Sequence, residues 1–428
     1  MVKLFNLAVN NEKEILEIIK NREEDLDVIN DVKLILEEVK KDKDKALIKF
    51  NKLFDKVDIT NLKVSKEEIN EAFKLVEEDF IEAIKGSIEN VKKYHEKQVK
   101  NGYSIFEKNG VFMGQLVTPL QRVGVYVPGG TASYPSSVVM NVIPAKIAGV
   151  SEIVMVTPPK NDGSINSYIL VAASLAGVSE IYKVGGAQSI GALAYGTETI
   201  KNVDKIVGPG NIYVAMAKKL VFGTVDIDMV AGPSEILVIA DENSNSKYIA
   251  ADLMSQAEHD KRAASILLTT SEKLYNEVLE EINIQIKDLE RKDIIEESLK
   301  NYGMAVICED INKCIELSNK IAPEHLELMI ENPLEYLGSV KNAGSIFLGY
   351  YSPEPLGDYY AGPNHVLPTN GTARFSSPLS VDSFIKKSSY LYYSKEELQK
   401  VSKNIMILAE KEGLTAHRNS VKVRVNND

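Results

Sequence analysis

The sequence predicts an α/β protein with two sheet domains, a helical segment before them and a tail after them. Short β-branched runs alternate with helical, glycine-punctuated stretches from Val123 onward, and this alternation is typical of parallel βαβ units. A chain of 428 residues also exceeds what one hydrophobic core usually organises. The apolar fraction of 44% and the charged fraction of 26% are those of an ordinary globular protein.

Composition argues against several classes of partner. The 50 basic and 61 acidic residues give a net charge of −11, which is a poor field for attracting nucleic acid or anionic lipid. No apolar run approaches the roughly 20 residues that cross a bilayer, and the N-terminus lacks the apolar stretch of a signal peptide. We therefore expect a cytoplasmic protein. The two cysteines, Cys308 and Cys314, match neither a zinc knuckle nor a redox pair, so two reduced thiols are predicted.

Residues 1 to about 100 are predicted to be helical. Ser65 and Glu68 form a capping-box pattern before the apolar positions Ile69, Ala72, Phe73 and Val76, which recur at helical spacing. The many Lys and Glu residues of this segment are best explained as solvated helix faces.

The first α/β series contains the strand-like runs VGVYV, EIVMVT, EIYKVGG, DKIVGPG and VDIDMV. Within it the hexapeptide AGVSEI occurs at 148–153 and again at 176–181, each time where a helix is expected to end at Gly and a strand to begin. The repeat supports repeated α/β units in this region.

The second series contains EILVIAD, ASILLTT, GMAVICED and GSIFLG, with amphipathic stretches between them. The two series together predict two doubly wound sheets, each covered by helices. The break between them is expected near Ala231-Gly232-Pro233, where glycine and proline interrupt regular structure.

The tail from about residue 379 contains one amphipathic helix. Ser394 and Glu397 form its capping box, Gly413 stops it, and its apolar stripe is Leu398, Val401, Ile405 and Leu408. Such a stripe must dock on the body of the chain or on a second subunit. We favour the second subunit because the tail also carries His417. A compact monomer in size-exclusion chromatography with light scattering would contradict this.

Two pairs of polar residues could carry chemistry. Gln256 and His259 lie three apart on a predicted helix, so both side chains can face one point, although such pairs are usually surface residues. Glu324 and His325 follow Pro323, and a carboxylate beside an imidazole can divide acid and base work. The alternative is that Glu324 lies at a helix N-terminus, where its negative charge interacts favourably with the helix dipole.

Two further segments carry ionisable residues among turn-forming ones. Asp358 and His365 belong to LGDYYAGPNHVLPTNGTARF, and Glu412 and His417 to EGLTAHRNS, just beyond the last helix. Both are predicted loops, and shaped loops often carry sites, although a surface loop is the alternative for the second. The possible donor set of Gln256, His259, Asp358 and His417 contains no thiolate, which is compatible with zinc, manganese or cobalt.

Neither G-x-G-x-x-G nor G-x-x-x-x-G-K-[ST] is present, so the standard phosphate-binding fingerprints are missing. Three predicted strands instead end in Val127-Pro128-Gly129-Gly130, in Gly185-Gly186-Ala187-Gln188 and in Gly208-Pro209-Gly210-Asn211. Glycines that enter helices at the carboxyl ends of strands let backbone N–H groups approach a nucleotide or phosphate. Plain tight turns are the alternative.

The motifs RVGVYVPGG, YPSSVVMN-x-IPAKIAGV, VGGAQSIGALAYGTETI, VGPGN, AGPSEILVIAD, DLMSQAEHD, IAPEHLELM, GDYYAGPNHVLPT and GLTAHRNSV resemble the histidinol dehydrogenase family. The resemblance runs from about residue 20 to the end, in the order of the family. Val230, Tyr360 and Asn370 stand where many members have other residues, and none of these departures removes a functional side chain.

The resemblance implies zinc and NAD as cofactors, with NAD on incomplete Rossmann-like domains. Its implied roles are zinc ligands at Gln256, His259, Asp358 and His417, and proton transfer by Glu324 and His325. The four zinc ligands and His325 would also contact substrate, together with Ser234, His365 and Glu412. Tyr126, Gln188 and Asn211 would contact NAD.

The resemblance also suggests how the chain is divided. Residues 1–20 would be a helical extension, 21–125 with 233–378 a zinc and substrate domain, 126–232 the NAD domain, and 379–428 a tail on the partner of a homodimer that supplies His417.

The implied reaction oxidises L-histidinol to L-histidinal and then to L-histidine with two NAD, the last steps of histidine biosynthesis. His325 would accept the proton of the alcohol, and Glu324 would help water add to the aldehyde. The alternatives are a zinc and NAD dehydrogenase of another amino alcohol, and a non-enzymatic metal-binding dimer. The complete set of acid, base and ligand side chains disfavours the second.

Overall fold

The structure is a computed structural model that describes residues 3–6, 12–20, 26–107, 110–129 and 134–425. The chain divides into two compact units, Met1–Gln98 with Leu120–Phe384, and Val99–Pro119 with Ile385–Asp428. No helix among the described residues is both long and apolar enough to cross a membrane. The larger unit contains two parallel sheets with helices on both faces, so the predicted α/β class with two sheet domains is confirmed.

The first sheet has five parallel strands in the order β6-β5-β4-β7-β8. Its strands are β4 (Arg122–Tyr126), β5 (Glu152–Thr157), β6 (Glu180–Lys183), β7 (Lys205–Val207) and β8 (Asp226–Ile227). Numbered along the chain this is 3-2-1-4-5, the order of a doubly wound sheet without its sixth strand. The chain adds β5 and β6 on one side of β4 and then β7 and β8 on the other, so the switch point lies between β4 and β7.

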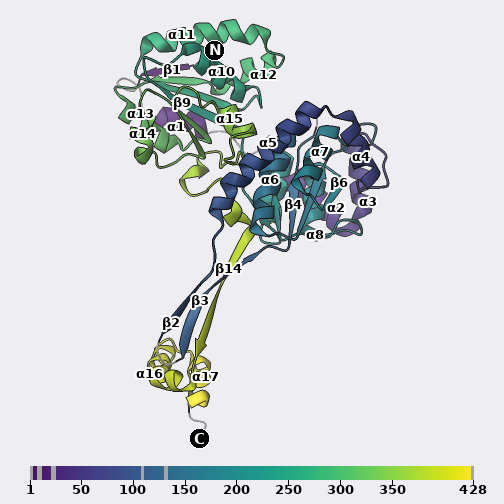
Figure 1. The fold of residues 1–428 in the computed structure, drawn as a ribbon, viewed down its shortest axis with the longest axis vertical. Helices are drawn as coiled ribbons and strands as arrows, with labels where there is room; N and C mark the ends of the chain where they lie inside the picture. Colours follow the sequence, from purple (N-terminus) through teal and green to yellow (C-terminus); the bar gives the residue numbers. More distant parts are fainter. Residues whose placement is uncertain (1–2, 7–11, 21–25, 108–109, 130–133, 426–428) are drawn as a thin grey trace. The chain divides into compact units, whose positions relative to one another are not determined.

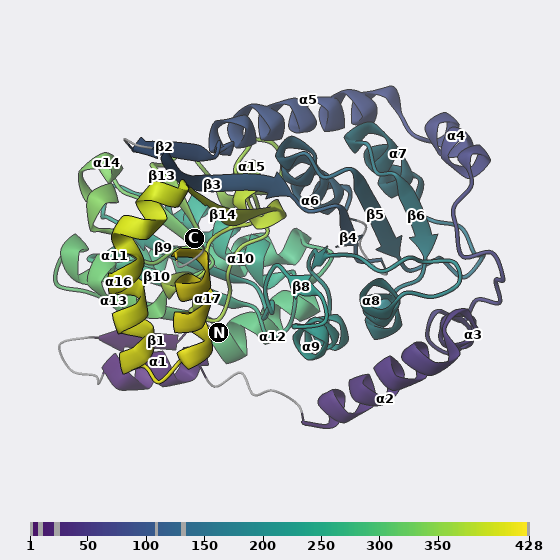
Figure 2. The ribbon, with the colours of Figure 1, turned by 90° about the horizontal axis from the view of Figure 1, so that it is seen from below.

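Helices cover both faces of this sheet (Figure 2). One face packs on α4 (Lys66–Leu75), α5 (Glu78–His95), α6 (Pro135–Ala148) and α7 (Ser167–Ala176). The other face packs on α2 (Leu26–Asp42), α3 (Asp44–Phe50), α8 (Gly186–Tyr195) and α9 (Ile212–Val221). The strands are buried on both faces, which explains why they read as continuous apolar runs.

The repeated hexapeptide does what the sequence predicts. Helix α6 ends at Ala148 and Gly149 follows with φ 93°, while α7 ends at Ala176 and Gly177 follows with φ 91°. Strands β5 and β6 then begin three residues after these glycines. Left-handed backbone at a helix end favours glycine, so the two copies mark two equal helix-to-strand turns.

The second sheet has six parallel strands in the order β1-β11-β10-β9-β12-β13. Its strands β1 and β9 are labelled in Figure 1. The strands are β1 (Lys3–Asn6), β9 (Glu235–Ala240), β10 (Ala264–Thr269), β11 (Met304–Ile307), β12 (His325–Met329) and β13 (Ser345–Leu348). Its last five strands repeat the order 3-2-1-4-5. The predicted N-terminal helical extension therefore begins with a strand, which adds to the edge beside β11.

Helices also cover both faces of the second sheet. One face packs on α10 (Ser246–Ala257), α11 (Glu272–Gln285) and α12 (Lys292–Tyr302). The other packs on α1 (Glu12–Lys20), α13 (Ile311–Ile321) and α14 (Pro333–Tyr336), with Cys308 and Cys314 as buried free thiols. The two reduced thiols are as predicted.

The helices of residues 26–95 pack on the five-stranded sheet, whereas the sequence groups 21–125 with 233–378. Their apolar stripes do not specify which of two sheets they cover, and the structure puts this segment with residues 122–227. The predicted capping box is present, because Ser65 accepts from the N–H of Glu68 and the Glu68 carboxylate accepts from the N–H of Ser65. A π-helix, η1 (Asn51–Asp55), follows α3.

The smaller unit consists of a three-stranded antiparallel sheet and two helices. Its sheet has the order β14-β3-β2, from β2 (Tyr103–Glu107), β3 (Val111–Pro119) and β14 (Ile385–Tyr393). Ser394 caps α16 (Lys395–Lys411) as predicted, and Gly413 follows it with φ 74°. A second helix, α17 (Thr415–Val425), replaces the loop expected there. Several large apolar side chains stay exposed: Phe106, Leu116, Leu391, Tyr392, Leu408 and Leu414.

Candidate functional site

A cavity of about 490 Å³ lies in the larger unit, where the carboxyl edge of the five-stranded sheet and the amino edge of the six-stranded sheet both contribute to its wall. The loops after β4 and β7 form one side, and the residues before β9 and β12 form the other. Many of the residues singled out from the sequence line it: Asn211, Ser234, Gln256, His259, Glu324, His325, Asp358 and His365.

Glu324 and His325 stand at the start of β12, because His325 is the first residue of that strand. The helix N-terminus considered for Glu324 is therefore wrong. The neighbouring strand β9 holds both side chains through Glu235: its N–H donates to the Glu324 carboxylate at 2.9 Å, and its C=O accepts from Nδ1 of His325 at 2.9 Å. These two hydrogen bonds form because β9 and β12 are paired neighbours in the parallel sheet.

The environment of this pair is buried and rich in carboxyl groups. Burial raises the pKa of Glu324 to about 8. Burial alone would lower the pKa of His325, but Glu324, Asp358 and Glu354 outweigh it and raise the pKa to about 10. A carboxyl and an imidazole with pKa values far from their usual ones are candidates for proton transfer.

Nε2 of His325 faces the short helix α15 (Glu354–Tyr359), which occupies part of the segment expected to be a loop. Nε2 lies 3.6 Å from Oδ1 of Asp358 and 3.8 Å from Oε1 of Glu354. These three side chains come close enough together to hold a cation. Glu354 was not recognised in the sequence, and its pKa is raised to about 8, first by burial and then by Asp358.

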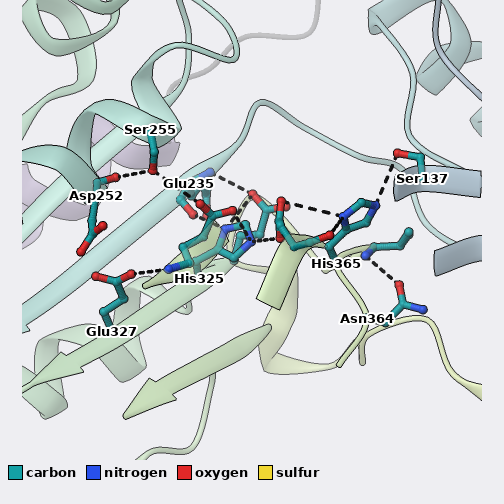
Figure 3. Close-up of polar contacts among 12 residues, drawn as sticks. Ser137, Glu235, Asp252, Ser255, His325, Glu327, Asn364 and His365 are labelled. Carbon is teal, nitrogen blue, oxygen red and sulfur yellow. Dashed lines mark hydrogen bonds and ion pairs between the residues drawn. The ribbon is translucent and has the colours of Figure 1, made fainter. Parts of the chain in front are cut away.

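Glu327 and Asp252, labelled in Figure 3, add two more carboxyl groups to this cluster. The Glu354 N–H donates to Glu327 at 2.8 Å, and Ser255 reaches the Glu354 carboxylate at 3.4 Å. Burial raises the pKa of Glu327 and that of Asp252. Since neighbouring buried carboxyls cannot all ionise, this layer holds protons at neutral pH.

Gln256, His259 and Asp358 present suitable donors for a metal ion. Helix α10 ends at Ala257, so His259 lies in the turn beyond it and not on the helix as predicted. Oε1 of Gln256 is buried without a hydrogen-bond partner among the described residues. Burial lowers the pKa of His259, and the pKa of Asp358 is also lowered, because His325 and His365 outweigh the effect of burial. A neutral imidazole, a carboxylate and an orphaned amide oxygen fit a divalent cation.

His365 is held in the loop after α15. Its Nδ1 lies 3.0 Å from the backbone oxygen of Asp358, and its Nε2 lies 3.4 Å from Oγ of Ser137 on α6. In Figure 3 its ring points toward Ser137, and Asn364 directly precedes it in the same loop. The loop is fixed by Asn364, which donates to the backbone oxygen of Met140 at 2.6 Å.

The glycine turn after β7 is the best-defined part of the opposite wall. Gly208 has φ 113°, and a Cβ there would meet the backbone oxygen of Tyr126 at 2.1 Å. Lys218 donates to the Gly208 C=O at 2.9 Å, and the Gly208 N–H donates to Asp228 at 2.8 Å. Lys218 and Asp228 also form an ion pair and are 2% and 1% exposed. This buried pair, missed in the sequence, clamps the turn.

The three candidate nucleotide residues are placed differently. Asn211 lines the cavity and caps α9, accepting from the N–H of Val214 at 3.2 Å. Tyr126 and Gln188 do not line this cavity and are buried, at 4% and 1% exposure. Burial raises the pKa of Tyr126 to about 12, and Oε1 of Gln188 has no hydrogen-bond partner among the described residues. Gly130 of the first glycine turn lies outside the described residues.

Glu412 and His417 belong to the smaller unit. Glu412 directly follows α16 and His417 lies in α17, and both are exposed. The structure therefore does not bring them together with Gln256, His259 and Asp358 within one unit.

Comparison with known proteins identifies the family. A sequence model described as histidinol dehydrogenase matches residues 19–425. The histidinol dehydrogenase of Clostridium acetobutylicum is 62% identical over 94% of this chain and 93% of its own, and that of Caldanaerobacter subterraneus subsp. tengcongensis is 56% identical over 100% of both. The crystal structure of histidinol dehydrogenase from Elizabethkingia anophelis has a TM-score of 0.93 and 43% identity, covering 99% of this chain and 98% of that one. The resemblance seen in the motifs is confirmed, and the chain belongs to the histidinol dehydrogenase family.

Proposed function

We propose that the protein oxidises L-histidinol through L-histidinal to L-histidine and reduces two NAD, as the last steps of histidine biosynthesis. The observation that carries the proposal is the buried Glu324 and His325 pair, which lines one cavity with Gln256, His259 and Asp358 in a chain of this family. An alcohol oxidation needs a base for its hydroxyl proton and an acceptor for its hydride; one wall of the cavity offers the base, and the other would hold the NAD that accepts the hydride.

The nucleotide is assigned to the wall formed by the glycine turns. The turn Gly208–Asn211 enters α9 at the carboxyl edge of a parallel sheet, where dinucleotides usually bind. Asn211 would contact NAD directly. Tyr126 and Gln188 keep the assignment that the family resemblance implies, and the unpartnered amide oxygen of Gln188 supports it.

A zinc ion is assigned to Gln256, His259 and Asp358, with His417 of the partner subunit as fourth ligand. The orphaned Oε1 of Gln256 and the lowered pKa values of His259 and Asp358 suit such a site. When bound, zinc would serve as a template that holds the amino and imidazole nitrogens of the substrate. His365 and Ser234 would complete the substrate contacts from the chain, and Glu412 from the partner subunit.

His325 and Glu324 divide the proton transfers. In the first oxidation His325 accepts the hydroxyl proton while the hydride passes to NAD. The product of this step is the aldehyde. In the second oxidation, Glu324 takes a proton from the water that adds to the aldehyde, and the resulting hydrate anion would give its hydride to a second NAD, which converts it to the carboxylic acid. The pKa of His325, which Asp358 helps to raise, falls toward the working range of a base once a cation offsets that carboxylate.

The smaller unit is assigned to the subunit interface of a homodimer. The two helices and three strands of this unit leave large apolar side chains exposed, including Phe106, Leu391 and Leu408. Exposed apolar surface of this kind is typical of a protein–protein interface. Mixing His325→Asn and His417→Asn chains tests this arrangement, because a mixed dimer then contains one site with both histidines intact. Random mixing should restore about a quarter of wild-type activity. No recovery would put both histidines of a site on one chain.

The direct test is NADH formation by the zinc-loaded protein with L-histidinol, compared with other amino alcohols at equal concentration. L-Histidinol should give the highest kcat/KM. Preference for another amino alcohol would favour a dehydrogenase of different specificity, and zinc binding without NADH would favour a non-enzymatic metal-binding dimer. A cytoplasmic location, without nucleic-acid or membrane partners, remains the prediction from composition.

A further inference from the structure

Arg291 carries a charge that is not paired with any other side chain in the described part of the chain. The residue immediately precedes α12 and is half-buried, and its guanidinium makes no hydrogen bond or ion pair to another described residue. Arg262 on the same cavity is different, because its Nε donates to Asp260 at 3.2 Å. A guanidinium keeps its charge at any physiological pH, and a partly buried charge without a partner costs free energy. The contrast between Arg262 and Arg291 indicates that the guanidinium of Arg291 is available to bind a ligand.

Arg291 lies where two cavities meet. It lines the cavity that contains Gln256 and His259, and it also lines a second cavity of about 490 Å³. Aromatic side chains form part of the walls of the second cavity, namely Phe80, Tyr134, Tyr168, Tyr359 and Tyr360. His259 lines both cavities together with Arg291. The guanidinium is therefore close to the assigned metal ligands.

The chemistry of the reaction limits what such a group can bind. L-Histidinol carries an ammonium group and no anion, so a guanidinium would repel it. Two species in the reaction do carry oxyanions, namely NAD through its pyrophosphate and the product through its new carboxylate. A planar guanidinium binds both kinds of group with paired hydrogen bonds.

We propose that Arg291 is an oxyanion-binding residue of the active cavity, which takes either the nucleotide pyrophosphate or the product carboxylate. The proposal rests on the proposed function for the identity of these ligands. It assigns no proton transfer to Arg291, since its role is to bind an anion and to leave the cationic substrate alone.

The test compares Arg291→Gln with Arg262→Gln as the matched control and Arg291→Lys as the charge-preserving variant. Isothermal titration calorimetry of the zinc-loaded protein measures the affinities for ADP-ribose, L-histidine and L-histidinol. Loss of a charge-assisted hydrogen bond should weaken one anionic ligand by about 10- to 100-fold. Arg291→Lys should recover part of that loss, and affinity for L-histidinol should not fall.

The ligand that weakens identifies the source of the oxyanion. Weaker ADP-ribose binding assigns the pyrophosphate, and weaker L-histidine binding assigns the carboxylate. Equal affinities in Arg291→Gln and Arg262→Gln would overturn the proposal, as would loss of the dimer with unchanged affinities, which would make Arg291 an interface residue. Binding needs no turnover, so a wild-type protein that binds ADP-ribose through Arg291 but does not oxidise L-histidinol would refute only the proposed function.

Discussion

The two parallel sheets of the larger unit share one strand order and use opposite edges. In the five-stranded sheet the cavity meets the carboxyl ends of β4 and β7, as expected for doubly wound sheets. In the six-stranded sheet it meets the amino ends of β9 and β12, where Ser234 and Glu324 precede the strands. Strand order alone therefore does not determine which edge of a sheet carries chemistry. The site arises because two different edges line one cavity.

The two edges also differ in charge. The carboxyl edge offers the backbone of Gly208–Asn211, which the buried pair of Lys218 and Asp228 holds in place. The amino edge concentrates ionisable side chains, among which burial raises the pKa of Glu324 and of Glu354 to about 8. Backbone N–H groups suit a nucleotide and shifted carboxyls suit proton transfer, so each edge should respond to a different kind of substitution.

The largest effect is expected at the amino edge. His325→Asn should lower kcat by about 10²- to 10⁴-fold, as for loss of general-base help, with little change in the affinity for NADH. Steady-state kinetics and NADH titration check this pair of results. A variant that loses NADH affinity in proportion to kcat would show that the two edges do not act separately.

At the carboxyl edge, Lys218→Met should destabilise the fold and weaken the binding of NAD. Removing one partner of a buried ion pair typically costs about 3–5 kcal/mol, and the freed Gly208 C=O loses its donor. Urea unfolding and the KM for NAD measure both effects. Lys219→Met, one residue along the same helix, is the control. An unchanged KM for NAD in a folded Lys218→Met protein would contradict a nucleotide role for this turn.

The metal ligands provide a third test. Gln256→Ala should lower the affinity for zinc by at least about 10- to 100-fold, because even the loss of a residue that only supports a metal ligand lowers metal affinity by that much. Gln285→Ala on α11 is the control for loss of a glutamine side chain. Zinc content after dialysis against a competing chelator measures the difference. Equal zinc content in both variants would remove Gln256 from the site and leave the cluster of His325, Glu354 and Asp358 as the better candidate.

The smallest effect concerns pH. In the zinc-free protein His325 has a folded pKa of about 10, above the value of about 6.5 in an unfolded chain. Its contribution to stability is therefore complete below pH ~6.5 and is lost as the pH rises through the folded value. Urea unfolding should show that the free energy of unfolding decreases from pH 7 to pH 9. This decrease should be smaller in His325→Asn than in the wild-type protein. An equal decrease in both proteins would assign it to other groups.

Local features of the sequence predicted much of this fold. The capping box at Ser65, the N-cap at Ser394 and the repeated AGVSEI depend on neighbouring residues, and these were found as expected. The reciprocal half of a capping box is not seen among the described residues at Ser394, whose N–H donates to the backbone oxygen of Gly110. Pairing of β3 with β14 joins segments more than 250 residues apart, and no local pattern encodes it. The same limit applies to helices α2–α5, whose stripes fit either sheet.

The candidate site shows a similar division. Motifs pointed to His259, Glu324 and His325, because their residue types already suggest chemistry. Glu354 was missed because it stands between two prolines in an apparent loop, and only its position against His325 distinguishes it. Lys218 looked like one more helix lysine until the structure buried it against Asp228. Burial and long-range contact are the properties that the sequence conceals.

The yield of NADH per L-histidinol tests the central claim most directly, because both oxidations are assigned to one cavity between the two edges. With limiting L-histidinol, excess NAD and zinc-loaded protein, the account predicts two NADH for each substrate molecule, since the aldehyde stays bound between the steps. One NADH with free aldehyde trapped by semicarbazide would contradict the shared cavity. No NADH would contradict the proposed oxidation itself.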